Sequence, residues 1–429
     1  MIKKIHISII LITAFLFRLI LSFLTWHGDL NNHMDWGIRF WQYGAKGFYE
    51  SNVWSFTWPN QPPGTIYLFA GVRKVYEGIF TLFSYLHFSL HVFPGRALLY
   101  MQTNLYPALL KFPSILSDLG IGYLVYLILL GVIKNKKEAK KVAKLGMIIW
   151  LFNPVIWYNS SVWGQTDAIV SFFAILAFYF LLKRRIFPAI LVFAISIYIK
   201  ASLAIFGPIF LFFLLLQRYP FKKIVESLVF AILVIIFITL PFSHGNPIVW
   251  LINIYQNKVL AEQLHAITAN AFNLWAGIAG ISIRPDSTIL GPLTYQVWGI
   301  ILFVVFNIPV FYVIYKKQTT EALFWCLSVI AFASFMLLTN MHERYLYPFF
   351  PVFTIVALYN KKLLPLYWII SIISLLNLYN FWWVPKINVV VEFLSFGDRL
   401  VPRILGFISF GIFIYLYLKF LRQFGKSKL

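Results

Sequence analysis

The sequence predicts an all-α, polytopic integral membrane protein with about twelve transmembrane helices. Of its 429 residues, 61% are hydrophobic and only 12% are charged, whereas soluble domains are near half apolar with about a quarter of their residues charged. The apolar residues also come in long blocks, such as residues 296–315, and a spanning helix needs about 20 of them. Basic residues fall in short loops between these blocks, which is typical of membrane proteins.

The first span is expected over residues 5–26, directly after Lys3 and Lys4. It has Arg18 in its interior and lacks a small-x-small cleavage site, so we interpret it as a retained span rather than a removed signal peptide. The formal net charge of +22 follows from basic inner loops and does not indicate nucleic-acid binding. The single cysteine, Cys326, excludes an intramolecular disulfide.

The remaining spans alternate across the membrane. They are expected at residues 114–133, 142–158, 168–182, 186–199, 201–216, 224–240, 295–315 and 322–339, then up to 360, and at 363–379 and 401–420. Basic stretches at 134–141, 183–185 and 218–223 follow even-numbered spans, so the positive-inside rule places both chain ends in the cytoplasm. We therefore expect one multi-pass domain, residues 1–429, in the inner (plasma) membrane.

Two long segments are expected outside, at residues 27–113 and 241–294. The first is rich in Trp, Tyr and Pro and contains two apolar stretches, residues 66–72 and 79–93, which are too short to span comfortably. We expect these to form two interfacial helices along the membrane surface. The alternation of spans also brings the polar clusters of the chain to this outer face.

The densest polar cluster, residues 27–36, follows the first span and carries Asp29 and Asp35. A carboxylate at a water–lipid boundary can act as a general base on a hydroxyl, so both are candidate catalytic residues. Their spacing does not put them on one helix face, and we expect an irregular turn followed by a helix near Asn32. The alternative is that Asp29 caps this helix and Asp35 is simply solvated.

A second cluster, His342-Glu343-Arg344, follows the ninth span. It is not a zinc motif, because the residue four positions after His342 is Leu346. The planar, permanently charged fork of Arg344 can pair with a phosphate, and His342 could donate a further hydrogen bond. The alternative is an Arg–Glu pair at a helix end, with Arg344 reaching to the membrane interface.

Three more polar residues are expected at the outer face. Gln165 and Asp167 lie in a short loop before the fourth span, and Lys200 lies at the junction of two short spans. Lys200 is either a turn marker or a phosphate ligand, and its pattern alone favours the turn. No metal-binding constellation is evident, although two outer carboxylates could hold a divalent ion. We therefore predict a reaction that needs no metal or other cofactor.

In chain order, these motifs resemble those of the GT-C glycosyltransferases, and most closely the bacterial and archaeal relatives of the GPI-anchor mannosyltransferases. The likeness covers residues 1–364, and its most specific motifs are Trp-Gly-Gln-x-Asp and His-Glu-Arg-Tyr-Leu. The matching residues are Gly28-Asp29, Trp36, Gly47-Phe48-Tyr49, Gln61-Pro62-Pro63-Gly64, Lys111-Phe112-Pro113 with Asp118, Asn153-Pro154, Val162-Trp163-Gly164-Gln165-Thr166-Asp167, Lys200 and His342-Glu343-Arg344-Tyr345-Leu346-Tyr347-Pro348.

The resemblance implies a membrane enzyme whose donor is a sugar on a polyprenyl phosphate and whose active site faces away from the cytoplasm. Asp29 stands at the position of a first-loop aspartate that acts near the acceptor hydroxyl, and we assign it as the base. Arg344, His342 and Lys200 are expected to bind the phosphate of the lipid donor. The residues expected to hold the sugar or the acceptor are Gln165, Asp167, Glu343 and Tyr345.

The expected reaction transfers a hexose, mannose by family resemblance, to a glycan, lipid or protein acceptor. A single base opposite the leaving group predicts inversion at the anomeric carbon. Three alternatives stay open: a flippase or transporter of lipid-linked sugars, an oligosaccharide ligase or polymerase, and a non-catalytic scaffold for envelope assembly. A transporter would need polar residues threading the spans on both sides, whereas here they collect on one face.

Overall fold

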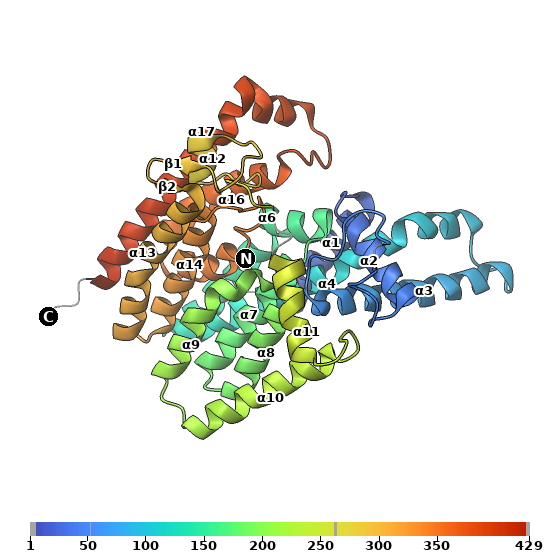
Figure 1. Ribbon diagram of the computed structural model, residues 1–429, viewed down its shortest axis with the longest axis horizontal. Helices are drawn as coiled ribbons and strands as arrows, with labels where there is room; N and C mark the ends of the chain where they lie inside the picture. Colours follow the sequence, from blue (N-terminus) through green and yellow to red (C-terminus); the bar gives the residue numbers. More distant parts are fainter. Residues whose placement is uncertain (1–5, 52, 261–263, 426–429) are drawn as a thin grey trace.

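A computed structural model describes residues 6–51, 53–260 and 264–425 as an almost entirely helical chain (Figure 1). The basic residues Lys3, Lys4, Lys426 and Lys428 lie outside this part of the chain. The α-helices are Ile7–Leu24 (α1), Leu30–Tyr43 (α2), Pro63–Phe88 (α3), Gly95–Val132 (α4), Lys136–Leu151 (α5), Pro154–Trp157 (α6), Asp167–Leu182 (α7), Ile186–Ile199 (α8), Gly207–Leu216 (α9), Phe221–Thr239 (α10), Pro247–Ile254 (α11), Leu274–Ala279 (α12), Tyr295–Lys316 (α13), Thr320–Leu337 (α14), Phe349–Tyr359 (α15), Leu364–Tyr379 (α16) and Asn388–Gly425 (α17). Shorter helical turns are Tyr158–Trp163 (η2), Ala201–Phe206 (η3), Tyr255–Leu260 (η4) and Lys361–Leu363 (η5), and the strands Ile289–Leu290 (β1) and Leu293–Thr294 (β2) form one antiparallel pair.

Six of the described helical stretches are long and apolar enough to cross a membrane: α1, α4, α13, α14, α17 and Lys361–Tyr379, which contains α16. Shorter apolar helices lie at Asp167–Leu182, Ile186–Ile199, Ala201–Leu216 and Phe349–Tyr359. The chain is therefore a helical membrane protein by the length and composition of its helices. Each span expected from the sequence overlaps a helix among the described residues, but only half of the twelve overlap one of the six stretches that are both long and apolar enough.

The long helices differ in how deeply they are buried. The apolar window of α14 is 89% buried, against 22% for α1 and 28% for α13. A helix that is apolar all round and buried belongs to the core of a bundle. By contrast, α1 and α13 expose large apolar side chains such as Ile12 and Ile308. These exposed faces are the ones suited to contact lipid, and α14 forms the centre of the bundle.

The structure corrects the expectation of two short interfacial helices in the first outer segment. One helix, α3, covers the first apolar stretch, the polar residues after it and the second stretch as far as Phe88. Those polar residues support each other on the helix surface, since Glu77 pairs with Arg73 at 2.8 Å and with Lys74 at 2.7 Å. Pairs at these spacings stabilise a helix by about 0.2–0.5 kcal/mol each. The polar stretch therefore continues the helix instead of breaking it.

The next helix also begins earlier than the sequence suggested. α4 starts at Gly95 and includes Pro107 and Pro113 in its interior, although proline usually ends or kinks a helix. Tyr106 packs against Tyr76 of α3 with ring centroids 5.1 Å apart, so tertiary packing supports this stretch. The hairpin of α3 and α4 extends well beyond the rest of the bundle, at the right of Figure 1. Most of the expected outer loop 27–113 is thus helical.

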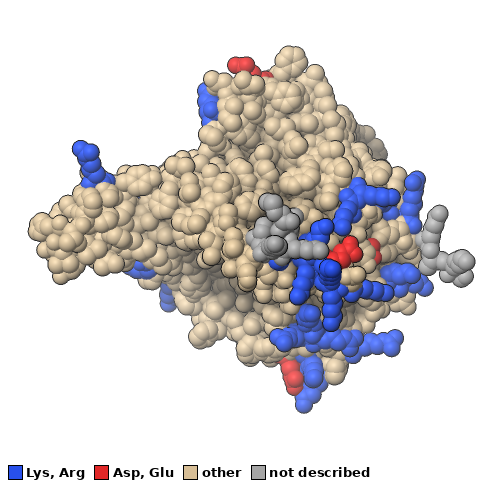
Figure 2. All heavy atoms as spheres, turned by 180° about the vertical axis from the view of Figure 1, so that it is seen from behind, with Lys and Arg blue, Asp and Glu red and all other residues tan. Residues whose placement is uncertain are grey.

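Basic side chains gather on one part of the surface (Figure 2). Contacts also bring together several loops that the sequence placed on the inner side. Lys361 Nζ lies 3.7 Å from Glu138 Oε1, which joins the α4–α5 turn to the α15–α16 turn. Gln423 donates a 2.6 Å hydrogen bond to Glu321, which joins the end of α17 to the start of α14. These inner loops therefore share one end of the bundle.

Candidate functional site

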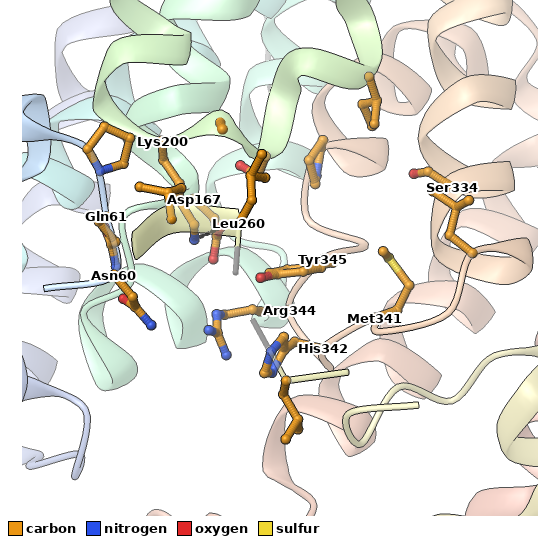
Figure 3. Close-up of a pocket in the computed structure, with 18 residues that line it drawn as sticks. Asn60, Gln61, Asp167, Lys200, Leu260, Ser334, Met341, His342, Arg344 and Tyr345 are labelled. Carbon is orange, nitrogen blue, oxygen red and sulfur yellow. Dashed lines mark hydrogen bonds and ion pairs between the residues drawn. The ribbon is translucent and has the colours of Figure 1, made fainter. Parts of the chain in front are cut away.

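The candidate residues lie where helices begin or end. Asp29 follows α1, Gln165 and Asp167 lie at the start of α7, Lys200 follows α8, and residues 342–345 lie between α14 and α15. The structure brings these segments together. Figure 3 shows side chains from three of them converging on one space: Asp167, Lys200, His342, Arg344 and Tyr345.

Two neutral donors hold the carboxylate of Asp29. Its Oδ2 accepts hydrogen bonds from Trp163 Nε1 at 3.0 Å and from Gln165 Nε2 at 2.6 Å. Asp29 precedes α2, which begins at Leu30, but its side chain makes no capping hydrogen bond. The capping alternative is therefore wrong. Neutral donors orient the carboxylate without neutralising it, so it can still accept a proton from a hydroxyl.

A tight turn delivers both donors to Asp29. Trp163 ends the π-helical turn η2, and Gly164 follows with a φ of +81°. A Cβ on Gly164 would lie 2.7 Å from the Leu30 side chain and 3.0 Å from that of Lys111. Glycine fits because it alone adopts this φ freely and leaves room for the neighbours. The reversal at Gly164 lets Trp163 and Gln165 reach the same carboxylate oxygen.

Asp35 has a different environment. It is buried; its Oδ1 pairs with Arg39 Nε at 3.2 Å and its Oδ2 accepts the Ser55 amide at 2.9 Å. The alternative that Asp35 is simply solvated is therefore wrong. Its bonds tie the chain after α2 to α2 itself. Neither Asp35 nor Asp29 lines either of the two cavities described below. Asp35 is the weaker candidate because it already pairs with a cation, whereas Asp29 has only neutral hydrogen-bond donors among the described residues.

A cavity of about 360 Å³ lies beside these residues. Its polar lining residues include Asn60, Gln61, Asp167, Lys200, His342, Arg344 and Tyr345. Its apolar lining residues include Ile205, Val259, Leu260, Leu264, Leu338, Met341 and Pro348. The volume lies in the range of small-molecule sites, which are usually apolar clefts with a few placed polar groups. The cavity suits a ligand with a charged head and an apolar tail.

Each of the two cations at the cavity has a carboxylate partner. Lys200 Nζ lies 2.8 Å from Asp167 Oδ1, and Arg344 Nη1 lies 2.9 Å from Glu343 Oε1. Burial lowers the pKa of Lys200, while the Asp167 carboxylate opposes that shift. Burial is the largest influence on Arg344 and opposes its charge, but Glu343, Tyr345, Asp29 and Asp167 together outweigh burial and raise the pKa of the guanidinium. Asp167 Oδ2 and Arg344 Nε have no hydrogen-bond partner among the described residues, so the pairs leave bonding capacity for a ligand.

His342 forms the wall of the cavity next to Arg344. Backbone bridges join His342 to Ala269 and Asn270, which fixes this segment against the stretch between α11 and α12. Burial, together with Arg344, lowers the pKa of His342 well below its usual value. The ring is therefore neutral at pH 7 and can donate one hydrogen bond. Glu343 is buried and serves as the counter-ion of Arg344, rather than facing the first cavity.

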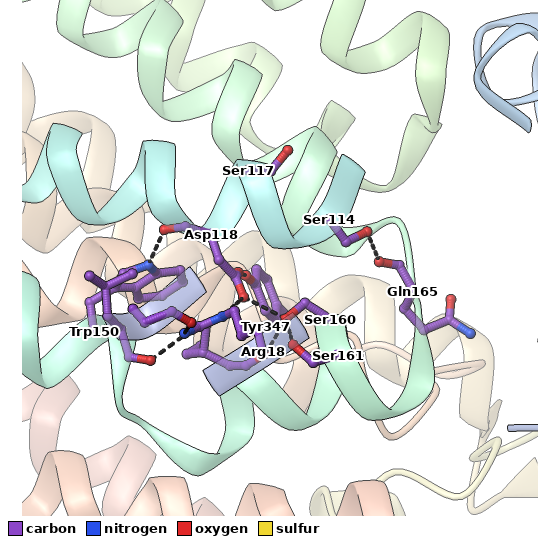
Figure 4. Close-up of polar contacts among 12 residues, drawn as sticks. Arg18, Ser114, Ser117, Asp118, Trp150, Ser160, Ser161, Gln165 and Tyr347 are labelled. Atoms are coloured by element: carbon purple, nitrogen blue, oxygen red, sulfur yellow. Dashed lines mark hydrogen bonds and ion pairs between the residues drawn. The ribbon is translucent and has the colours of Figure 1, made fainter. Parts of the chain in front are cut away.

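A buried polar network anchors the segment that carries Arg344 (Figure 4). Asp118 of α4 accepts hydrogen bonds from Tyr347 Oη at 2.5 Å, Arg18 Nε at 3.1 Å and Ser160 Oγ at 2.6 Å. Asp118 thereby joins α1, α4, the η2 turn and the segment after α14. Since η2 also presents a donor to Asp29, this network fixes both halves of the site relative to each other.

Sequence reasoning noted these residues but missed their roles. Arg18 was noted only as a charge inside the first span, and Asp118 only as part of a motif. Ionisable side chains within spans almost always pair with each other, so two lone opposite charges in neighbouring spans could have predicted this pair. Lys111 likewise donates to the carbonyls of Ser22 (3.0 Å) and Thr25 (2.7 Å) at the end of α1. It is a helix cap and not a free cation.

The described residues contain no group of three or more His, Cys, Asp or Glu side chains that could hold a metal ion. The site instead offers one oriented carboxylate, two paired cations and an amphipathic cavity. This set can take a proton from a hydroxyl and bind an anion on an apolar chain. No protein-family model matches the sequence, and a search of curated proteins found no match either.

Proposed function

We propose that this chain is a membrane glycosyltransferase of the GT-C type, which transfers a hexose from a polyprenyl-phosphate donor to an acceptor hydroxyl. One observation carries the proposal. Trp163, which with Gln165 orients the carboxylate of Asp29, has its ring centroid 5.7 Å from the guanidinium carbon of Arg344, and Arg344 lines the cavity together with Lys200. A base and a cationic site for a lipid phosphate are the two elements that this reaction requires.

The reaction is a displacement at the anomeric carbon. Asp29 takes the proton from the acceptor hydroxyl as its oxygen forms the new bond to the anomeric carbon. The bond from that carbon to the phosphate oxygen breaks, and its electron pair stays on the phosphate. Arg344 and Lys200 stabilise the charge that develops there, and the neutral ring of His342 donates a hydrogen bond. Attack opposite the leaving group inverts the anomeric configuration.

The apolar lining residues of the cavity would hold the first isoprene units of the donor. Tyr345 lies between the two cations, with its ring centroid 5.8 Å from Lys200 Nζ and 5.5 Å from the Arg344 guanidinium carbon. Its ring therefore supports the orientation of both cations by cation–π attraction. Gln165 donates a hydrogen bond to Asp29, and Asp167 pairs with Lys200. We therefore propose that Gln165 and Asp167 position the reacting groups. The Oδ2 of Asp167 stays available to accept a hydrogen bond from a sugar hydroxyl.

We place the site on the outer side of the inner membrane, with both chain ends in the cytoplasm. The support is the clustering of basic loops, since cytoplasmic loops carry the excess of Lys and Arg. Those loops follow the ends of helices such as α4 and α7, whereas the candidate site gathers at the start of α7 and the end of α14. The two groups of residues thus lie at opposite ends of these helices.

The test is sugar transfer by the purified full chain with synthetic short-chain polyprenyl-phosphate hexoses, following release of the polyprenyl phosphate by mass spectrometry. We expect Asp29→Asn to lower kcat by about 10²–10⁴-fold, the usual contribution of a general base, while donor binding persists. The matched control is Glu392→Gln, an exposed carboxylate on α17, which should leave the rate unchanged. Full activity of Asp29→Asn would refute the assignment of the base. Saturable donor binding without turnover by any acceptor would favour a transporter of lipid-linked sugars.

A further inference from the structure

A second cavity, of about 430 Å³, lies next to the first. It is lined by Leu264, Thr268, Ala269, Asn270, Ile281, Ser282, Ile283, His342, Glu343, Phe381, Trp382 and Arg399. His342 and Leu264 line both cavities, Arg344 lines only the first, and Glu343 lines only the second. The segment carrying these residues is therefore a wall shared by two binding spaces. A transfer reaction has two substrates, and the proposed function gives an occupant only to the first space.

The aromatic wall of the second cavity lies close to the proposed base. The ring of Trp382 lies 4.5 Å from that of His27 and 5.3 Å from that of Trp163, centroid to centroid. A Cβ on Gly28 would lie 3.9 Å from the Trp382 ring. Trp163 in turn donates to Asp29. A molecule resting on Trp382 is thus separated from the carboxylate of Asp29 by only one layer of side chains.

Two features show what chemistry the second cavity would accept. Phe381 and Trp382 offer partly exposed aromatic faces, which suit the apolar C–H face of a pyranose ring. The guanidinium carbon of Arg399 lies 3.4 Å from the Phe381 ring centroid, and its Nη1 is buried without a hydrogen-bond partner among the described residues. An unbonded buried donor is costly unless a ligand satisfies it, and an anionic oxygen is the strongest acceptor for a guanidinium.

The backbone around Arg399 is unusual in a way that directs its side chain. Gly397, Asp398 and Arg399 all have φ between +52° and +65° inside the stretch Asn388–Gly425, where they separate two helical parts. Non-glycine residues rarely adopt positive φ, and such residues cluster at functional sites. The turn brings Arg399 back over Phe381 instead of continuing the helix. The backbone turn thus fixes the position of the Arg399 guanidinium, so this side chain does not move freely at the surface.

We propose that the second cavity is the acceptor site and that it binds a saccharide bearing an anionic group, with the sugar ring on Trp382 and the anion on Arg399. This inference rests on the proposed function, because it gives the second substrate of that reaction its place. In this arrangement the lipid phosphate enters from one side of the 342–344 wall and the acceptor from the other. The bound acceptor then lies on Trp382, which packs against Trp163, the residue that donates a hydrogen bond to Asp29.

The test is equilibrium binding to the full chain in lipid nanodiscs. The probes are an octyl hexoside, its 6-phosphate and the corresponding octyl hexuronide, each in the gluco, manno and galacto series. We expect Trp382→Ala to weaken binding of all three probe types at least tenfold. Arg399→Gln should weaken only the phosphate and uronate probes, and the stronger of these two in wild type identifies the anion. The matched controls are Trp383→Ala, which changes an aromatic next in the chain that lines neither cavity, and Lys386→Gln, which removes an exposed cation of the same loop.

A second probe, a short-chain polyprenyl phosphate, separates this inference from the proposed function. Its binding should be weakened by Arg344→Gln, unchanged by Arg399→Gln, and not displaced by the octyl hexoside 6-phosphate. Displacement, or saccharide binding that Trp382→Ala leaves unchanged, or no saturable saccharide binding at all, would overturn the acceptor site. If the wild-type chain does not bind the polyprenyl phosphate, while its saccharide binding still depends on Trp382, the donor assignment is refuted and the saccharide site stands.

Discussion

Replacing Arg18 by methionine should lower the free energy of unfolding by about 3–5 kcal/mol, the usual cost of leaving one partner of a buried ion pair alone. Arg18 and Asp118 are fully buried and lie 3.1 Å apart. Without the guanidinium, Asp118 keeps only two neutral donors, Ser160 at 2.6 Å and Tyr347 at 2.5 Å. The carbonyl of Leu151 also loses the 2.7 Å bond from Arg18, which adds about 1 kcal/mol to the loss.

The double variant Arg18→Met/Asp118→Leu distinguishes the cost of leaving Asp118 charged and unpaired from the cost of the lost hydrogen bonds. It removes both charges, so it should recover at least about 2 kcal/mol relative to Arg18→Met, because apolar replacements of a buried pair are often near neutral. The assay is unfolding in mixed micelles by titration with sodium dodecyl sulfate, followed by circular dichroism. The control is Lys222→Met, which breaks an exposed pair with Glu226 at 3.8 Å and should cost less than about 1 kcal/mol. A double variant as unstable as Arg18→Met would refute the idea that the isolated charge causes the loss.

Two further variants test how the site is built. Gly164→Ala places a Cβ 2.7 Å from the Leu30 side chain at a φ of +81°. We expect the left-handed backbone alone to lower the free energy of unfolding by about 1–2 kcal/mol, which thermal unfolding measures. We also expect a lower kcat in the transfer assay, because the distorted turn moves Gln165 away from Asp29. Burial lowers the pKa of His33 from its usual 6.5 to about 4. Because the unfolded chain then takes up a proton at a higher pH than the folded chain, stability is full above pH 6.5 and falls as the pH drops towards about 4. His33→Gln should reduce that acid sensitivity, which melting temperatures measured across this window would show; an unchanged pH dependence would contradict it.

Much of the fold could be predicted from the sequence, because the helices follow from apolar runs that need no knowledge of distant partners. The junctions were predictable for the same reason: Lys200 and residues 342–345 lie between helices, as expected. The single helix over most of residues 66–93 was not predictable, because the charged residues between its two apolar stretches interrupt the hydropathy pattern. On one helix face those charges pair as Glu77 with Arg73 and Lys74, and pairing replaces the missing apolar contacts.

The partners of the site residues were beyond sequence reasoning, with two local exceptions. Trp163 and Gln165 are more than 130 positions from Asp29, and tertiary packing brings them together. The exceptions are the pair of Arg344 with Glu343, which the sequence offered as an alternative, and the pair of Asp35 with Arg39, which stands four residues later on the same helix, where such pairs form routinely. The two carboxylates of residues 27–36 therefore differ in their local partners. A basic residue stands within one helical turn of Asp35 in the sequence, whereas no Lys or Arg stands that close to Asp29.

The counter-ions explain how the phosphate site that we propose can persist without a bound phosphate. A buried cation alone is costly, so Lys200 and Arg344 would move or lose charge in the unliganded protein if nothing balanced them. Asp167 and Glu343 balance them, but each pair uses only part of the available bonding, as the unpartnered Asp167 Oδ2 and Arg344 Nε show. The cations are thus held in place before the donor arrives, and little reorganisation is needed when negative charge develops on the leaving phosphate. Such preorganisation is the main source of electrostatic stabilisation of a transition state, which ties the buried ion pairs of this site to the reaction we propose.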